Sequence, residues 1–290
     1  MRFVKGHGTE NDFLLLPDLD GAIQLTPVMV RALCERHAGI GADGVLRVVR
    51  SENDPESKEM AAEAPFFMDY RNADGSVAEM CGNGIRVFLR YLIAASLVES
   101  SAAVATRGGT RRARTSGGGN VTVQMGLPRV LADRPVATAA PLPGLAGAAV
   151  PPTAGTVIEM PNPHVVVPLT TLDELAALDL SRPPSVEPPL PNGQNVEFVV
   201  RRGPRHLQMR VHERGVGETR SCGTGICAAA VAAATSDGVG ADDTAWQVDV
   251  PGGRCEVVWQ RDGEVEMTGP AVLLADIDVH ADWLADPQGG

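Results

Sequence analysis

The sequence lacks an excess of positive charge and contains almost no lysine. Its 36 acidic and 25 basic residues give a formal net charge of −11 at pH 7. Nucleic-acid-binding proteins concentrate positive charge, so this balance argues against a nucleic-acid partner. Lys5 and Lys58 are the only two lysines. A pyridoxal enzyme needs a lysine that forms a Schiff base, and neither lysine lies in a phosphate-cradling glycine loop, so we expect no cofactor.

Long apolar runs are also missing. No run approaches the roughly 18 residues of a membrane span, and the N-terminal stretch MRFVKGHGTENDFLLL does not have the pattern of a signal peptide. We therefore expect a cytoplasmic protein with no membrane partner. The five cysteines are an odd number in a chain for a reducing compartment, so we expect free thiols. With 290 residues, 44% of them hydrophobic, the chain is long enough for two domains of about 100–150 residues each.

The chain contains an internal repeat. NDFLLLP at residues 11–17 matches NPHVVVP at residues 162–168 with an offset of 151, and GADGVLRVV from Gly41 resembles GQNVEFVV from Gly193 with an offset of 152. FFMDYRN at 66–72 then matches LQMRVHE at 207–213 with an offset of 141. The drop of 11 is explained by an insertion in the first copy, the polar stretch 51–65, whose composition suits a loop or mobile excursion.

Proline-rich stretches suggest where the copies are joined. Residues 127–155 are rich in Pro, Ala and Gly, as a linker or irregular edge would be, and predict a boundary near residue 128. The predicted lobes are residues 1–128 and 129–270. The stretch SRPPSVEPPLPNG at 181–193 is expected to be a loop, since repeated proline cannot occupy a central strand. Most other segments are β-like runs with few helices, which indicates an α+β fold.

Each copy carries a cysteine before Gly-x-Gly and an apolar run: MCGNGIRVFLRYL at 80–92 and SCGTGICAAAVAA at 221–233. The apolar residues recur at helical spacing, and Asn83 and Thr224 are good N-cap types. Cys81 and Cys222 would then lie just outside the first turn, where free N–H groups and the helix dipole favour an anion. That anion can be a thiolate, or a ligand carboxylate bound by the amides of Gly82, Asn83, Gly223 and Thr224.

Two such thiols facing one substrate carbon across a cleft could invert a stereocentre. A thiolate would remove a proton from one face while a thiol delivers one to the other, and each positioned group contributes about 10²–10⁴-fold. A dipole effect of about 0.3–2 kcal/mol shifts a pKa by at most about one and a half units. Closure around the substrate must therefore supply much of the remaining stabilisation.

The ordered motifs KGHGTENDF, GIGADGVL, YRNADGSVAEMCGNGIR, NPH, GQNVEF, VHERGVGETRSCGTG and PGG resemble the diaminopimelate epimerase family over nearly all of the chain. The resemblance implies two pseudo-symmetric α/β lobes, each a β-rich sheet wrapped around a central helix, with the active site between them and residues 271–290 returning to the first lobe. It implies a homodimer that needs neither cofactor nor metal. Its reaction would be epimerisation of LL-2,6-diaminopimelate to the meso isomer, in lysine and peptidoglycan-precursor synthesis, with Cys81 and Cys222 as the acid/base pair.

The resemblance also implies substrate-binding residues. Arg214 would pair with the distal carboxylate, a role that its planar fork fits. Glu213 would contact the substrate amino group or assist a thiol, with His164 beside it. Four asparagines would fix the polar ends of the substrate: Asn11, Asn72, Asn162 and Asn195. Glu10 and Gly44 depart from the family pattern, since relatives more often carry a neutral residue at the first position and some carry a polar side chain at the second, which leaves fine specificity open.

Several alternatives stay open at this point. The scaffold could serve a racemase of another amino acid, as in the proline racemase relatives, or the paired cysteines could be a thiol-redox switch in a non-enzymatic protein. A metal site could be assembled from His206, His212, Glu213 and Cys222, although the close paired spacing of zinc ligands is missing. Asparagines commonly cap and turn, Arg214 could be a surface charge, and His164 could be a core ring in the place of Phe13. The other three cysteines, Cys34, Cys227 and Cys255, are expected to be small buried apolar residues.

Overall fold

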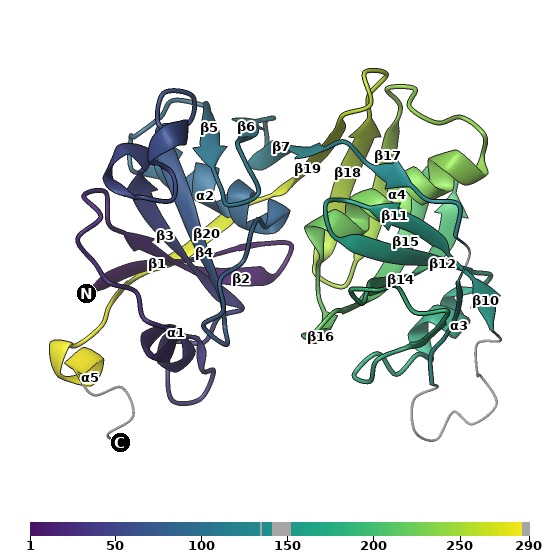
Figure 1. Cartoon of the computed structure of the whole chain (residues 1–290), viewed down its shortest axis with the longest axis horizontal. Coiled ribbons are helices and arrows are strands. Elements are labelled where there is room, and N and C mark those ends of the chain that lie inside the picture. Colours follow the sequence, from purple (N-terminus) through teal and green to yellow (C-terminus); the bar gives the residue numbers. More distant parts are fainter. Residues whose placement is uncertain (134, 141–151, 286–290) are drawn as a thin grey trace. The chain divides into compact units, whose positions relative to one another are not determined.

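The structure is a computed structural model that describes residues 1–133, 135–140 and 152–285 (Figure 1). The chain divides into two compact units. Unit 1 comprises Met1–Val123 and the segment from Gly269 onward, and unit 2 comprises Gln124–Thr268. Parts of the predicted linker, at 134 and 141–151, and the last five residues of the predicted return segment lie outside the described residues.

Unit 1 is a mixed sheet around one central helix. The strands pair in the order β20-β1-β2-β3-β4-β5-β6-β7, with β2 parallel to β3, β4 parallel to β5 and the remaining pairs antiparallel. Helix α2 packs against strands β1, β2, β3, β5, β6 and β20. The elements are β1 (Arg2–Gly8), β2 (Asn11–Pro17), α1 (Pro27–Cys34), β3 (Gly44–Arg50), the 3₁₀ turns η1 (Ser51–Asn53) and η2 (Lys58–Met60), β4 (Phe66–Asn72), α2 (Gly82–Ala94), β5 (Ser101–Ala105), β6 (Arg111–Thr115), β7 (Asn120–Gly126), β20 (Val272–Asp278) and α5 (Ala281–Ala285).

Unit 2 repeats this plan. The order β8-β11-β12-β14-β15-β17-β18-β19 has β12 parallel to β14 and β15 parallel to β17, with antiparallel pairs elsewhere. A short strand, β16, pairs with the end of β15, and β10, β9 and β13 form a separate small sheet. The elements are β8 (Arg129–Val130), β9 (Val136–Thr138), β10 (Thr153–Ala154), β11 (Thr156–Glu159), β12 (Pro163–Leu169), α3 (Leu172–Ala176), β13 (Ser185–Glu187), β14 (Asn195–Gly203), β15 (His206–Glu213), β16 (Gly217–Thr219), α4 (Gly223–Ser236), β17 (Ala245–Val250), β18 (Gly253–Trp259) and β19 (Val265–Pro270).

The central helix α4 is apolar on all sides. From Gly225 to Val231 every residue is buried, and the helix packs against β11, β12, β14, β15, β17 and β18. A helix without a polar face is stable only when it is enclosed, so the sequence GICAAAV itself requires the surrounding sheet. The matching pairing orders of the two units confirm the predicted α+β fold with two pseudo-symmetric lobes, each wrapped around a central helix.

The strand registers correct one step of the predicted repeat. Phe13 on β2 lies opposite Gly44, and His164 on β12 lies opposite Asn195. Both pairs have an offset of 151, so the offset of 152 for the second anchor was wrong by one residue. Aligning two glycine turns produced the slip, because loop lengths differ while strand register is fixed by the hydrogen-bonded ladder.

The correction has consequences for side chains. Gly44 is equivalent to Asn195, and Leu46 is equivalent to Glu197. A Cβ on Gly84 would lie 3.4 Å from Leu46, and a Cβ on Gly225 would lie 2.6 Å from Glu197 Oε1. These two close approaches, each to the first turn of a central helix, independently support the equivalence of Leu46 and Glu197.

Two segments expected to be loops are more ordered than their composition suggests. Residues 181–193 contain strand β13, which pairs with β9 at the edge of the small sheet, where proline neighbours are tolerated. The insertion 51–65 is packed rather than a mobile excursion. Ser51 and Ser57 are fully buried, and their hydroxyls donate to the carbonyls of Ala64 and Ser51 at 2.6 and 3.1 Å.

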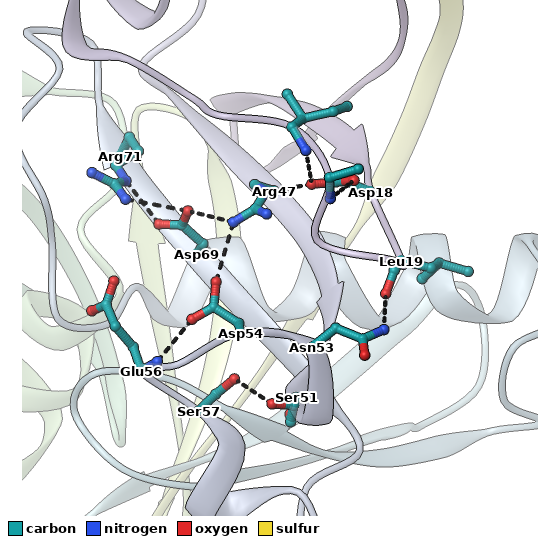
Figure 2. A network of polar contacts seen from close by, with 12 residues as sticks. Asp18, Leu19, Arg47, Ser51, Asn53, Asp54, Glu56, Ser57, Asp69 and Arg71 are labelled. Carbon is teal, nitrogen blue, oxygen red and sulfur yellow. Dashed lines mark hydrogen bonds and ion pairs between the residues drawn. The ribbon is translucent and has the colours of Figure 1, made fainter.

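A buried ion network anchors the insertion to the sheet (Figure 2). Arg47 on β3 donates to Asp18 at 2.7 Å and to Asp54 of the insertion at 3.2 Å, and it lies 3.5 Å from Asp69 on β4. Arg71 and Arg107 also donate to Asp69. Burial raises the pKa of Asp69, but the hydrogen bonds from these two arginines outweigh it, so the pKa lies below its usual value. The insertion is therefore held by charge pairing with the core strands of unit 1.

Candidate active site

Both motif cysteines are N-cap residues of the central helices. Cys81 precedes α2 with an extended backbone (φ −143°, ψ 115°), and its Sγ accepts a hydrogen bond from the Gly84 N–H at 3.3 Å. Cys222 precedes α4 with φ −116° and ψ 112°, and its Sγ lies 3.5 Å from the Thr224 hydroxyl. The two thiols therefore occupy the same position at two equivalent helix starts.

The expected caps were wrong by two residues. Asn83 and Thr224 lie inside the first turns, since α2 begins at Gly82 and α4 at Gly223. At Cys81 the thiol itself accepts the N–H of the third helical residue, as a serine or threonine oxygen would, so the helix starts earlier. The first-turn amides of Gly82, Asn83, Gly223 and Thr224 remain adjacent to the thiols, as the motif predicts.

A tight hairpin places Asn11 beside Cys81. Thr9 and Glu10 connect β1 to β2 with φ angles of 51° and 60°, values that two-residue hairpin turns require and non-glycine residues rarely adopt. Gly8 pairs with Asn11 across the turn. The Asn11 Oδ1 accepts from Asn83 Nδ2 at 3.2 Å and lies 3.7 Å from Cys81 Sγ. Glu10 is exposed at the tip of this turn.

Two charged residues that the motif analysis did not select lie beside Asn11 and Asn83 in unit 1. Asp43 accepts from Asn11 Nδ2 at 2.8 Å. Arg86 is fully buried in α2 and donates to Asn83 Oδ1 at 2.6 Å and to Thr9 Oγ1 at 3.0 Å. An arginine next to Ile85 at the start of an apolar run was the signal in the sequence that could have identified it.

Asn72 and Gly44 face each other at the edge of this region. Asn72 ends β4, and its Nδ2 donates to the Ser76 hydroxyl at 3.0 Å. A Cβ on Gly44 would lie 2.5 Å from the Arg71 carbonyl and 2.7 Å from the Tyr70 ring. The Tyr70 ring packs edge-on against Phe13, with centroids 5.9 Å apart. Gly44 is thus required by close packing, and Tyr70 fills the space that a polar side chain would take.

The thiol in unit 2 has carboxylates as neighbours. Cys222 is buried, and burial, with the charges of Glu213 and Glu197, raises its pKa well above the usual value. Burial also raises the pKa of Glu213, a shift that hydrogen bonds from Thr219 and Cys222 only partly offset. The surroundings of Cys222 therefore favour the protonated thiol.

His164 links the second asparagine to a buried carboxylate. Its Nδ1 lies 2.7 Å from Glu197 Oε1 and its Nε2 lies 3.0 Å from Asn162 Oδ1. The side chains of His164 and Glu197 are both 0% exposed, and within the described residues Glu197 Oε2 has no hydrogen-bond partner. The ring of His164 is therefore part of the buried core, and it also contacts Asn162, one of the predicted site residues. Glu197 was not selected from the sequence, although a glutamate inside the buried β run NVEFVV was a visible signal.

Asn195 and Arg214 lie at the start of β14 and just after β15. Asn195 donates to the Pro163 carbonyl at 3.2 Å and accepts from the Arg214 backbone N–H at 2.9 Å. The Arg214 guanidinium is exposed and donates to the Asn192 carbonyl, so its remaining donors are accessible to a ligand. The side-chain amide of Asn195 thus holds the backbone at Arg214 in place.

The structure does not assemble the alternative metal site. His206 Nε2 pairs with Asp249 at 2.7 Å and His212 Nδ1 contacts the Leu180 carbonyl at 2.9 Å. Among the described residues, no group of three or more His, Cys, Asp or Glu side chains is arranged to hold a metal ion.

All five cysteines lie in the described residues as thiols, and none of them is joined in a disulfide there. Cys34, Cys227 and Cys255 are buried, as predicted for small core residues. Burial raises the pKa of Cys34 to about 12, so this thiol does not ionise near neutral pH. Across the described part of the chain, no helix combines the length and the apolar character that crossing a membrane requires.

Comparisons with known proteins agree with the motif resemblance. The family model for diaminopimelate epimerase matches residues 3–131 and 156–274. The diaminopimelate epimerase of Streptomyces coelicolor is 52% identical, covering 97% of this chain and 96% of the relative. That of Thermobifida fusca is 50% identical, covering 96% and 98%.

Solved structures share the fold at low sequence identity. A phenazine biosynthesis protein of the PhzF family from Bacillus anthracis superposes with a TM-score of 0.70 at 16% identity, over 97% of this chain and 99% of that chain. A probable proline racemase from Agrobacterium radiobacter gives a TM-score of 0.66 at 15% identity, over 97% and 93%. These likenesses concern the fold alone.

Proposed function

Because the chain belongs to the diaminopimelate epimerase family, we propose that it is an isomerase that converts LL-2,6-diaminopimelate to the meso isomer in lysine and peptidoglycan-precursor synthesis. The observation that carries this proposal is the pair of cysteine-capped central helices within a full-length family match. The two cysteines provide two acid/base groups of one kind, and the family match indicates the substrate.

Cys81 and Cys222 act in this proposal on opposite faces of one α-carbon. The Sγ that is ionised takes the α-proton, and the electron pair of the broken C–H bond moves into the adjacent carboxylate. The other Sγ–H delivers its proton to the opposite face, so the stereocentre is inverted and the two thiols exchange protonation states. The reverse reaction uses the same steps with the roles exchanged.

The first-turn amides of Gly82, Asn83, Gly223 and Thr224 receive the α-carboxylate, on which charge develops during proton removal. Free N–H groups at a helix start suit this task because they are already oriented and need no reorganisation. Support comes from the caps, since both helices begin at the glycine that follows the cysteine.

The distal end of the substrate is assigned to Arg214 and the asparagines. Arg214 pairs with the distal carboxylate, for which a planar guanidinium offers two parallel donors. Asn11, Asn72, Asn162 and Asn195 bind the amino and carboxylate groups, and Glu213 and His164 act beside Cys222. The raised pKa values of Glu213 and Cys222 support a role for Glu213 next to the thiol.

The test is direct turnover of the purified protein. Incubation with LL-diaminopimelate should produce the meso isomer up to an equilibrium mixture, detected by chiral chromatography, and Cys222→Ala should serve as the inactive control. L-Proline offered under the same conditions should not be racemised. Racemisation of proline without conversion of diaminopimelate would contradict the proposal and favour the alternative hypothesis, a racemase of another amino acid.

We also assign the finer properties expected of the family, a homodimer in the cytoplasm. Light scattering at micromolar concentration should give a mass of twice 30.4 kDa. A mass of one chain over the same concentration range would overturn the dimer assignment.

A further inference from the structure

A chain of hydrogen bonds in unit 1 runs from a cation to an anion through two amides. Arg86 donates to Asn83 Oδ1 at 2.6 Å, Asn83 Nδ2 donates to Asn11 Oδ1 at 3.2 Å, and Asn11 Nδ2 donates to Asp43 Oδ2 at 2.8 Å. Cys81 joins this chain at its middle, since its Sγ lies 3.7 Å from Asn11 Oδ1.

The direction of the chain is set by the chemistry of its two ends. An amide has a donor and an acceptor of nearly equal size, so an isolated asparagine can turn by 180° without changing its shape. A guanidinium can only donate and a carboxylate can only accept. Arg86 therefore fixes the oxygen of Asn83, and Asp43 fixes the nitrogen of Asn11, which leaves Asn11 Oδ1 as the atom facing Cys81.

Both ends are held in place by further bonds. Asp43 Oδ2 also accepts from the Asp12 N–H at 3.1 Å, and Asp43 Oδ1 pairs with Arg36 at 2.7 Å. Arg86 donates to Thr9 at 3.0 Å and to the Pro270 carbonyl at 2.9 Å.

Arg86 is an unusual buried charge. Its exposed fraction is 0%, its Nε has no partner, and within the described residues it forms no ion pair with a carboxylate. A buried cation served only by neutral acceptors is costly for stability. A role in the site explains why an arginine occupies this position.

The direction matters for the proton on Cys81. A carbonyl oxygen facing the thiol accepts from S–H and favours the protonated form, whereas a reversed amide would present N–H₂ and favour the thiolate. The Gly84 N–H also donates to the sulfur, at 3.3 Å. We propose that Asp43 and Arg86 are positioning residues that fix the direction of this amide chain, so that Asn11 presents its oxygen to Cys81 and raises the affinity of the thiol for its proton.

This proposal deepens the proposed function, but its first test does not depend on turnover. The pH dependence of Cys81 alkylation by iodoacetamide is measured by peptide mass spectrometry in the Cys222→Ala background. Asp43→Asn keeps the shape of the side chain. An asparagine can donate as well as accept, so it no longer determines whether Asn11 presents its nitrogen or its oxygen to residue 43. The midpoint of alkylation should fall by about one pH unit, which is about tenfold faster alkylation at pH 7.

Asp12→Asn is the matched control, because it removes one negative charge from the same cluster without touching the Asn11 side chain. Its midpoint should move by less than about a third of the Asp43→Asn shift. Equal shifts would mean that only charge matters and would overturn the proposal, as would an unchanged midpoint in Asp43→Asn. Should that variant fail to fold, Asn11→Ala removes the acceptor itself and must lower the midpoint in the same way; an unchanged midpoint there also overturns the proposal.

The Arg86 end is tested by activity and conservative rescue. Arg86→Lys keeps a group that only donates and should retain kcat/KM within about threefold, whereas Arg86→Met leaves Asn83 free to turn and should lose about tenfold or more. Equal losses in both variants would overturn the role of Arg86. An inactive wild-type protein would instead refute the proposed function and leave the alkylation result standing.

Discussion

The two cysteine-bearing helix starts share a backbone but have different charged neighbours. The repeat registers pair Phe13 with His164, Leu46 with Glu197, Asn72 with Glu213 and Arg86 with Cys227. In unit 1 the equivalent positions hold an apolar pair, an amide and a buried cation, and in unit 2 they hold a hydrogen-bonded histidine and glutamate, a carboxylate and a thiol. Duplication thus kept the helix cap and changed the charges around it.

This difference shows that helix capping alone does not decide whether a thiol is ionised. Both sulfurs stand at a helix start, where the dipole favours an anion by about 0.3–2 kcal/mol. Around Cys222, burial and two carboxylates act in the opposite direction and raise the pKa. A two-base reaction needs one thiol and one thiolate at a time, and the surroundings of Cys222 favour the thiol at this position.

The largest expected effect comes from removing either thiol. Cys81→Ala and Cys222→Ala should each lower kcat by about 10³-fold or more, because neither proton transfer can be bypassed by its partner. Thermal melting should confirm that both variants fold. Full activity in one of them would show that the two starts are not an acid/base pair.

Replacing the buried pair His164 and Glu197 of unit 2 by the equivalent pair of unit 1 should show that the stability effects of the two substitutions are strongly coupled. His164→Phe leaves Glu197 buried without its partner and should reduce the free energy of unfolding by about 3–5 kcal/mol. The double variant His164→Phe, Glu197→Leu reproduces the Phe13 and Leu46 pair and should recover most of this loss. Denaturant unfolding followed by tryptophan fluorescence measures both; additive losses would contradict the equivalence of the two pairs.

The equivalent glycines of the two first turns should differ in their tolerance of alanine. A Cβ on Gly225 would lie 2.6 Å from Glu197 Oε1, whereas the nearest atom to a Cβ on Gly84 lies at 3.3 Å. Gly225→Ala should therefore destabilise by about 1–3 kcal/mol. Gly84→Ala should be nearly neutral, since its tight contact is offset by the higher helix propensity of alanine. Equal effects in denaturant unfolding would mean that Glu197 does not press on α4.

Removing the carboxylate of Glu213 should make the thiol of Cys222 easier to ionise. The charge of Glu213 helps to raise the pKa of Cys222, so Glu213→Gln should lower that pKa and speed alkylation at pH 8 by about tenfold. Glu218→Gln is the control, since that carboxylate pairs with Arg210 on the neighbouring strand. A rate for Cys222 that is unchanged in Glu213→Gln, or equally changed in the control, would remove Glu213 from the account.

The sequence predicts those helices and strands whose apolar residues recur at regular spacing. The repeat follows from matched stretches at nearly constant offsets, and the α+β class and the two helices after the cysteines follow from apolar spacing; all three were confirmed. The caps and one offset were wrong because local rules assign capping to asparagine and threonine oxygens and align loops by their glycines. The thiol cap of Cys81 and the ladder between β2 and β3 decide these points in three dimensions.

Residues whose partners lie far along the chain were not predicted. Asp43 meets Asn11 across 32 positions, and Glu197 meets His164 across 33. Arg86 lies near Asn83 in sequence, but its burial depends on strands from both ends of unit 1, including the Pro270 carbonyl. The polar composition of the insertion predicted a loop or a mobile excursion. It did not show the packing, because Asp54 meets Arg47 only once the chain has folded.

The central claim is that two different thiols serve the two faces of one carbon. The most direct measurement is isotope incorporation at low conversion of LL-diaminopimelate in deuterated water. Two thiols predict meso product that carries deuterium at the inverted α-carbon, while the remaining LL substrate carries almost none. Deuterium appearing in recovered substrate as fast as in product would mean that one group handles both protons, and would contradict the account.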